Sequence, residues 1–134
     1  MIVVDSSALI AILHRDVEAN SFLNIMVAAE GCLLSTVGLV ETSIVLAGRM
    51  GNETSWVLLE ELFVVTRVSI AEQDYAQAGI ARHAFLRYGK GRHPAALNMG
   101  DCAAYALAKT LDLPLLFKGN DFSRTDLVPA AAAV

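Results

Sequence analysis

Three aspartates stand where a predicted strand or helix begins or ends, which are places where catalytic carboxylates can meet. Asp5 directly follows the β-branched run 2–4 and precedes two serines. Asp121 follows a short apolar run, and Asp101 begins an apolar helical segment. Each also has an ordinary structural interpretation: Asp5 as a helix N-cap, Asp101 as a first-turn acid stabilised by the helix dipole, and Asp121 as a turn residue. The local sequence leaves both interpretations open.

Glu41 is the acid whose position is hardest to explain by structure alone. We expect its helix to have a buried stripe of four residues: Val37, Val40, Ile44 and Val45. Glu41 lies four residues after the first of these and three before the third, so its side chain is expected to point inward. A buried carboxylate must be neutralised, paired with a base or bound to a cation. The candidate bases are Arg49 and Lys118.

Together, the four acids predict a metal site. Acids near the ends of two strands, at a helix start and on a helix's inner face can meet at one edge of a parallel sheet. Converging carboxylates cannot all stay ionised without a cation. Their hard oxygen ligands favour Mg²⁺ or Mn²⁺, and the sequence lacks the Cys and His spacing of a zinc site. Such a site suits phosphodiester hydrolysis, in which the metal activates water and a free carboxylate accepts its proton.

A basic and aromatic segment precedes Asp101. Within residues 82–93, seven side chains suit contact with single-stranded nucleic acid: Arg82, His83, Arg87, Tyr88, Lys90, Arg92 and His93. We predict that Arg87, Lys90 and Arg92 bind the RNA substrate. For Arg82 and Arg87, cations that complement the end of a helix are an equally good interpretation. Lys90 and Arg92 stand in a glycine-rich loop, where that explanation is weaker.

The elements that would position these residues alternate between strand and helix. Short apolar runs predict strands at 2–4, 32–35, 63–68 and 115–117, with a last short strand near 127–129. Helices are expected at 8–13, 17–29, 37–50, 54–62, 71–88 and 101–110. The pattern predicts an α/β fold, a three-layer α/β/α sandwich around a mostly parallel sheet of four to five strands.

Length, composition and charge narrow the class of protein. The 134 residues are expected to form a single domain, 1–134, with a disordered tail from about 130 to 134. The net charge of −4 disfavours binding of nucleic acid by a basic surface alone, although setting aside the four candidate ligands leaves as many acidic as basic residues. No uncharged stretch is long enough to span a membrane and no secretory leader is visible, so we expect a cytoplasmic protein.

Four segments spread over essentially the whole chain form a recognisable set: residues 2–9, 40–42, 88–102 and 117–122. In these segments the chain resembles a PIN-domain ribonuclease, and specifically the VapC toxins of type II toxin-antitoxin pairs. The third, from Tyr-Gly-Lys-Gly-Arg-His-Pro-Ala to Leu-Asn-Met-Gly-Asp-Cys, is highly specific. The resemblance implies an acidic pocket that binds Mg²⁺ or Mn²⁺ and cleaves RNA. Asp5, Glu41 and Asp101 fall on near-invariant acids of the family, and Asp121 falls on a more variable fourth.

The resemblance also implies further contacts. Ser6 falls where the family has a Ser or Thr beside the metal site, and we include it among the substrate-binding residues. Such toxins usually form homodimers and are held inactive by a cognate antitoxin, and the apolar content of 55% is compatible with both contacts. One departure is Lys118, where family members often carry a small residue. A lysine there would neutralise an acid or contact phosphate.

Three functions are compatible with the sequence. The first is a metal-dependent endoribonuclease that hydrolyses RNA phosphodiester bonds as the toxin of a toxin-antitoxin pair, with the four acids as its metal ligands and catalytic groups. The second is a non-catalytic PIN-fold module that binds RNA or an antitoxin without cutting. The third is a phosphotransfer domain with Asp5 as nucleophile, but Ser7 stands where an Asp-x-Asp motif needs a second acid.

Overall fold

The computed structural model describes residues 1–51 and 53–130, so residues 131–134 of the expected tail lie outside the described part of the chain. Four parallel strands form the sheet: β1 (Ile2–Val4), β2 (Cys32–Ser35), β3 (Val68–Ala71) and β4 (Leu115–Leu116). Their order is β3-β2-β1-β4, with Ile2 opposite Cys32 and Val3 opposite Leu115. The predicted α/β class with a parallel sheet is confirmed.

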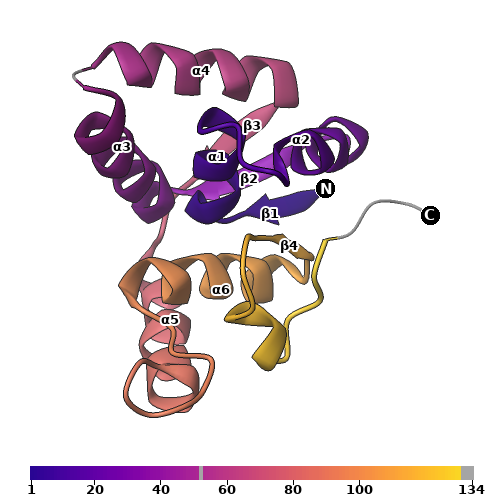
Figure 1. The fold of residues 1–134 in the computed structure, drawn as a ribbon. Helices are drawn as coiled ribbons and strands as arrows, with labels where there is room; N and C mark the ends of the chain where they lie inside the picture. The colour runs from indigo at the N-terminus through magenta and orange to yellow at the C-terminus, as the bar shows by residue number, and fades with distance from the viewer. Residues whose placement is uncertain (52, 131–134) are drawn as a thin grey trace.

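In the part of the chain that the structure describes, six helices cover the two faces of this sheet (Figure 1). One face carries α1 (Ser6–Leu13), α2 (Ala19–Ala28), α3 (Thr36–Met50) and α4 (Thr54–Thr66). The other carries α5 (Tyr75–Tyr88) and α6 (Met99–Leu111), and a short 3-10 helix, η1 (Phe122–Arg124), follows β4. In the described residues no helix is long and apolar enough to cross a membrane.

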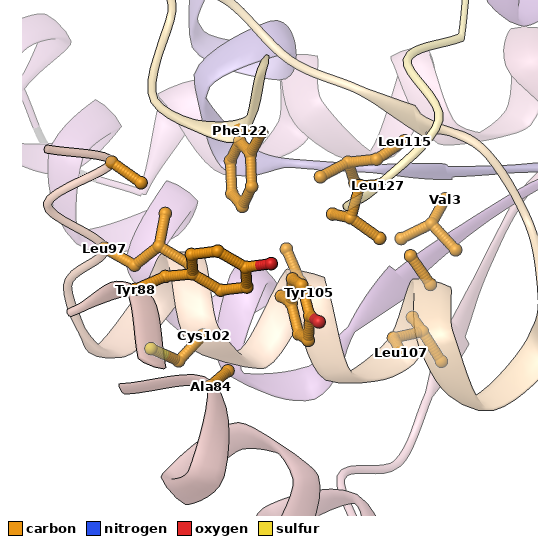
Figure 2. Packing of buried hydrophobic residues seen from close by; sticks show 13 residues of the cluster. Val3, Ala84, Tyr88, Leu97, Cys102, Tyr105, Leu107, Leu115, Phe122 and Leu127 are labelled. Atoms are coloured by element: carbon orange, nitrogen blue, oxygen red, sulfur yellow. The ribbon is translucent and has the colours of Figure 1, made fainter. Parts of the chain in front are cut away.

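Each face of the sheet has its own apolar core. Because successive side chains of a strand point to opposite faces, Ile2 and Val4 join one core and Val3 joins the other. The first core is formed by α1 to α4, with buried side chains that include Leu9, Leu34, Leu46 and Leu59. The second packs α5 and α6 against β1 and β4, with Tyr88, Leu97, Tyr105, Leu107 and Phe122 among its members (Figure 2).

Two predicted strands were wrong. The apolar run 63–68 belongs mostly to α4, which continues to Thr66, and the third strand is Val68–Ala71. Leu62, Phe63 and Thr66 are buried while Val64 and Val65 are exposed, which is helical spacing that a continuous apolar run conceals. Near 127–129 the chain forms only an isolated bridge between Leu115 and Pro129.

The carboxyl ends of the central strands meet at one edge of the sheet. Asp5 ends β1 and caps α1, and Ser35 ends β2 and caps α3. The backbone N–H of Asp5 donates to the carbonyl of Leu116 at 2.9 Å, so β1 and β4 are joined at this edge. The starts of α1 and α3 and the segment after β4 therefore lie together, as ligand-binding edges of parallel sheets require.

Candidate active site

Asp5 is the most deeply buried acid of the site, with 4% of its surface exposed. Its Oδ2 accepts the backbone N–H of Ser7 at 3.0 Å, so the structural interpretation as an N-cap of α1 is confirmed. Burial raises the pKa of Asp5 to about 7; the bonds from Ser7 oppose this rise, and the nearby Asp101 and Glu41 carboxylates add to it. The cap occupies one carboxylate oxygen of Asp5. Asp101 and Glu41 lie close enough for their charges to act on this carboxyl group.

Glu41 reaches from α3 to the first turns of α1 and α6. The hydroxyl of Ser6 donates to its Oε1 at 2.5 Å. Gly100 lies so close to it that a Cβ at this position would collide with the Glu41 carboxylate. Gly100 could not be recognised from the sequence, because a glycine early in a helix has no local signature for such a contact. A side chain at this position would force the Glu41 carboxylate to turn away.

Asp101 and Asn98 form a capping box at the start of α6. Asp101 Oδ2 accepts the backbone N–H of Asn98 at 3.0 Å, and Asn98 Oδ1 accepts that of Asp101 at 2.9 Å. Burial raises the pKa of Asp101 to about 6, opposed by the Asn98 bond and reinforced by Glu41 and Asp121. The expected position of Asp101 in the first turn of its helix is confirmed, and like Asp5 it binds a backbone N–H and has acidic neighbours.

Asp121 lies in the segment after β4, at the start of η1. Its side chain is exposed and makes no capping hydrogen bond, so the expected turn-cap role is wrong. The carbonyls of Asn120 and Asp121 bind Ser123 Oγ at 2.6 Å and the backbone N–H of Arg124 at 3.3 Å instead. Asp121 therefore keeps its carboxylate free, and its charge raises the pKa of Asp101.

Neither of the two candidate bases neutralises these acids. Lys118 Nζ lies 2.8 Å from Asp16 Oδ2 and 3.3 Å from Glu18 Oε2, and its backbone N–H donates to Ser7 Oγ. Arg49 forms its hydrogen bond with His14, at 3.0 Å. The expectation that Lys118 neutralises a site acid was wrong, because its long side chain reaches the segment between α1 and α2. Within the described residues none of the four acids has an ion pair.

The buried stripe predicted for α3 was wrong. Val40 and Ile44 are 57% and 66% exposed, and the residues that pack inward are Gly38, Thr42 and Leu46. The helix carries apolar side chains on both faces, so their spacing did not identify the buried one. The predicted stripe instead lines a groove of about 510 Å³, together with Glu41, Met99, Gly100 and Thr36. Glu41 is half-buried on the border of this groove.

The donor set fits a hard divalent cation. All four acids offer oxygen, and the caps on Asp5 and Asp101 each use one oxygen of the two. The mutual repulsion of Asp5, Glu41 and Asp101 is the kind of interaction that a bound cation relieves. As the side chains lie, no three Asp, Glu, His or Cys residues in the described ranges are close enough together to hold a metal. Binding would therefore require the carboxylates to turn toward one another.

The predicted RNA-binding cations lie near the end of α5 and in the loop that follows it (Figure 1). Arg87 lies 3.7 Å from Asp126 and over the ring of Tyr88, at 4.6 Å. Arg92 Nε donates to the carbonyl of Leu86 at 3.3 Å, while Lys90 is exposed. Arg87 and Arg92 thus have structural contacts of their own, and the contact of all three cations with RNA stays a prediction.

Comparisons with known proteins agree with this geometry. A family model described as the PIN domain matches residues 2–128. Ribonuclease VapC30 of Mycobacterium tuberculosis is 41% identical over 129 residues, which are 96% of this chain and 98% of the relative. Ribonuclease VapC of Mycolicibacterium smegmatis is 42% identical over 125 residues, 93% of this chain and 96% of the relative.

Two solved structures share the fold. VapC20 of Mycobacterium tuberculosis, a Sarcin-Ricin loop cleaving toxin, superposes with a TM-score of 0.77 at 18% identity, over 98% of this chain and 99% of the other. A toxin-antitoxin complex from Klebsiella pneumoniae superposes with a TM-score of 0.65 at 15% identity, over 94% of this chain and 93% of the other. At these identities the likeness concerns the fold.

Proposed function

The chain belongs to the PIN-domain family of VapC ribonucleases, the toxins of toxin-antitoxin systems, and from this we propose that it is an endoribonuclease whose four acids hold Mg²⁺ or Mn²⁺. The observation that carries the metal dependence is the group of unpaired carboxylates at the sheet edge. Burial raises the pKa of Asp5, the charges of Asp101 and Glu41 add to this rise, and no base in the described chain neutralises these three acids. A cation is the partner that such a group lacks.

Each residue has a distinct part in the proposed reaction. When bound, the metal polarises the phosphoryl oxygen and lowers the pKa of the attacking water. Asp5, Asp101 and Glu41 would hold it, and Glu41 is positioned by Ser6 and by the space at Gly100. The exposed carboxylate of Asp121 serves as a further ligand or accepts the proton of the water. Ser6 is buried and its hydroxyl is bound to Glu41, so in this proposal it positions that carboxylate, and its contact with the substrate stays a prediction.

The metal dependence is tested by incubating total cellular RNA with the purified protein in Mg²⁺, Mn²⁺ or EDTA. We expect discrete fragments with either metal and intact RNA with EDTA. Glu60→Gln is the control for substitution of a site acid such as Asp5→Asn. Glu60 is an exposed acid of α4 outside the site, so this variant should cleave RNA like the wild type. A folded protein that binds RNA but leaves it intact in every condition would instead support the non-catalytic module.

We propose that a cognate antitoxin covers the acidic pocket, with a basic side chain among the carboxylates. The unpaired acids support this arrangement, because a cation supplied by a partner would neutralise them as a metal does. The complex co-purified with its antitoxin should leave RNA intact until the antitoxin is removed by proteolysis. Cleavage by the intact complex would contradict it. A cytoplasmic location is part of the same proposal, and cell fractionation tests it.

We also propose a homodimer that uses the exposed apolar face of α3. Val40 and Ile44 are large apolar side chains at the surface, on either side of Glu41 in sequence. Sedimentation equilibrium should give twice the chain mass of 14.3 kDa for the wild type and the single-chain mass for Val40→Glu. Val57→Glu, on the exposed side of α4, is the matched control and should remain dimeric. A wild type that sediments as a monomer would contradict the dimer.

A further inference from the structure

A second hollow shares Met99 with the groove beside α3. Its volume is about 310 Å³, and α5 and the start of α6 form most of its wall. Met99 and Cys102 line it together, since residues three apart share a face of a helix. Asp101 lies between them in sequence, and Gly100 contacts Glu41. The hollow thus lies within one helical turn of the proposed catalytic acids.

The apolar part of this hollow suits a flat ring. Phe85 lines it and is 40% exposed, although α5 buries other aromatic surface such as Tyr88 in the core. Met99 is 80% exposed, and its unbranched thioether side chain adapts to many shapes and contacts aromatic rings favourably. An exposed phenylalanine beside an exposed methionine offers a surface on which a nucleobase can stack.

The polar part of the hollow supplies a cation and an amide. Arg82 lies three residues before Phe85, on the same face of α5, and has no ion pair within the described residues. Gln73 is fixed by its backbone N–H, which donates to Thr36 Oγ1 at 3.2 Å, while its side-chain oxygen is shielded from water without a hydrogen-bond partner. A buried acceptor without a partner is unfavourable, so a ligand that bonds this amide would relieve that cost.

We propose that this hollow binds an unpaired nucleobase of the RNA substrate, close to the bond that is cut. The base would stack on Phe85, present its edge to the amide of Gln73 after a turn of that side chain, and place a flanking phosphate at Arg82. The proposal rests on the proposed function, because the acids beside Met99 define where the RNA is cut. A free guanidinium and an unpartnered amide favour RNA over a second copy of the chain, whose apolar surface would satisfy neither.

The test is an abasic scan combined with variants of Phe85. Single-stranded RNA oligonucleotides, each lacking one base, are titrated into the full chain in EDTA, and binding is followed by fluorescence anisotropy. For the wild type, removal of one particular base should weaken binding about 5-fold to about 100-fold, the range expected for loss of one aromatic stack. For Phe85→Ala the same removal should change binding less than about twofold, since the stack is already gone.

Three comparisons keep the test specific to the hollow. Phe85→Tyr retains a ring and should respond to base removal as the wild type does. Leu86→Ala alters the exposed neighbour that does not line the hollow and should also match the wild type. Arg82→Ala should weaken binding of every oligonucleotide and reduce its salt dependence. Thermal unfolding of each variant verifies that the fold is retained.

The possible failures can be told apart. If RNA is cleaved with metal but no abasic position distinguishes the wild type from Phe85→Ala, the nucleobase site is refuted and the nuclease stands. If one abasic position distinguishes the wild type from Phe85→Ala but no RNA is cleaved under any condition, the base site stands and the proposed function fails. If Phe85→Glu instead changes the sedimenting mass and leaves RNA binding unaltered, a second copy covers the hollow and the proposal is overturned.

Discussion

Asp5→Asn is expected to abolish RNA cleavage while leaving the fold intact. Asparagine can still accept the N–H of Ser7 and so preserve the cap of α1. It removes the negative charge that would hold the metal beside Glu41 and Asp101. Since a positioned acid-base group alone contributes about 10²- to 10⁴-fold, and loss of a ligand removes the metal's contribution as well, we expect kcat/KM to fall at least about 10³-fold.

Without metal, the stability of the wild type should depend on pH in a way that Asp5→Asn removes. The pKa of Asp5 is about 7 in the folded protein, compared with an ordinary value of 3.8, so the folded state retains a proton that the unfolded state has lost between these values. The wild type should therefore lose stability as the pH rises from about 4 to about 7, and Asp101, with its pKa raised to about 6, contributes in the same direction. An asparagine side chain in place of Asp5 has no proton to lose.

Urea unfolding in EDTA at several pH values measures this difference. The rise of the pKa to about 7 corresponds to about 4 kcal/mol at most, so above pH 7 Asp5→Asn should be more stable than the wild type by up to that amount. Near pH 4 the two proteins should be equally stable, and added Mg²⁺ should stabilise only the wild type. Undiminished cleavage by the pure variant, or a stability difference independent of pH, would refute the assignment of Asp5.

Gly100→Ala should impair the site rather than the fold through a single methyl group. The added Cβ would collide with the Glu41 carboxylate, so Glu41 must turn away from Ser6 or the first turn of α6 must shift. The colliding atoms are the end of a flexible side chain, so Glu41 can turn away at little cost to stability, and the better helix propensity of alanine offsets that cost. Because small misplacements of catalytic groups are expensive, cleavage should fall about 100-fold.

Gly48→Ala is the matched control for this substitution. Gly48 lies in α3, and a Cβ there would have no neighbour within 4 Å. The control should retain full activity and gain up to about 1 kcal/mol in stability from the better helix propensity of alanine. Thermal unfolding and RNA cleavage of both variants provide the comparison. If Gly100→Ala cleaves RNA at the wild-type rate, the position of the Glu41 carboxylate does not matter for the reaction.

Capping and metal binding are compatible roles for the same carboxylates. Asp5 and Asp101 each use one oxygen to accept a backbone N–H at the start of a helix. These bonds fix the side chains without removing their charge, so the second oxygen of each stays available. From the sequence alone, the structural and the catalytic interpretations are alternatives. A carboxylate has two oxygens, however, so one can cap a helix while the other binds a metal.

The sequence by itself determined the class of fold and the position of Asp5 at the end of the first strand. A β-branched run that stops at Asp5, and an acid that begins the apolar helical segment at Asp101, depend on neighbours within a few residues and can be recognised without tertiary structure. The alternation of strands and helices then implies a parallel sheet, whose geometry brings strand ends to one edge. The family resemblance rested on the same segments.

Only the tertiary structure decided which face of each helix is buried and which charges pair. Val40 and Ile44 are exposed because the chain covers the opposite face of α3, and no periodicity states which of two apolar faces will be covered. Lys118 pairs with Asp16, a residue distant in sequence, because ion pairs depend on distance in space. The contact between Gly100 and Glu41 likewise exists only once α3 and α6 are packed together.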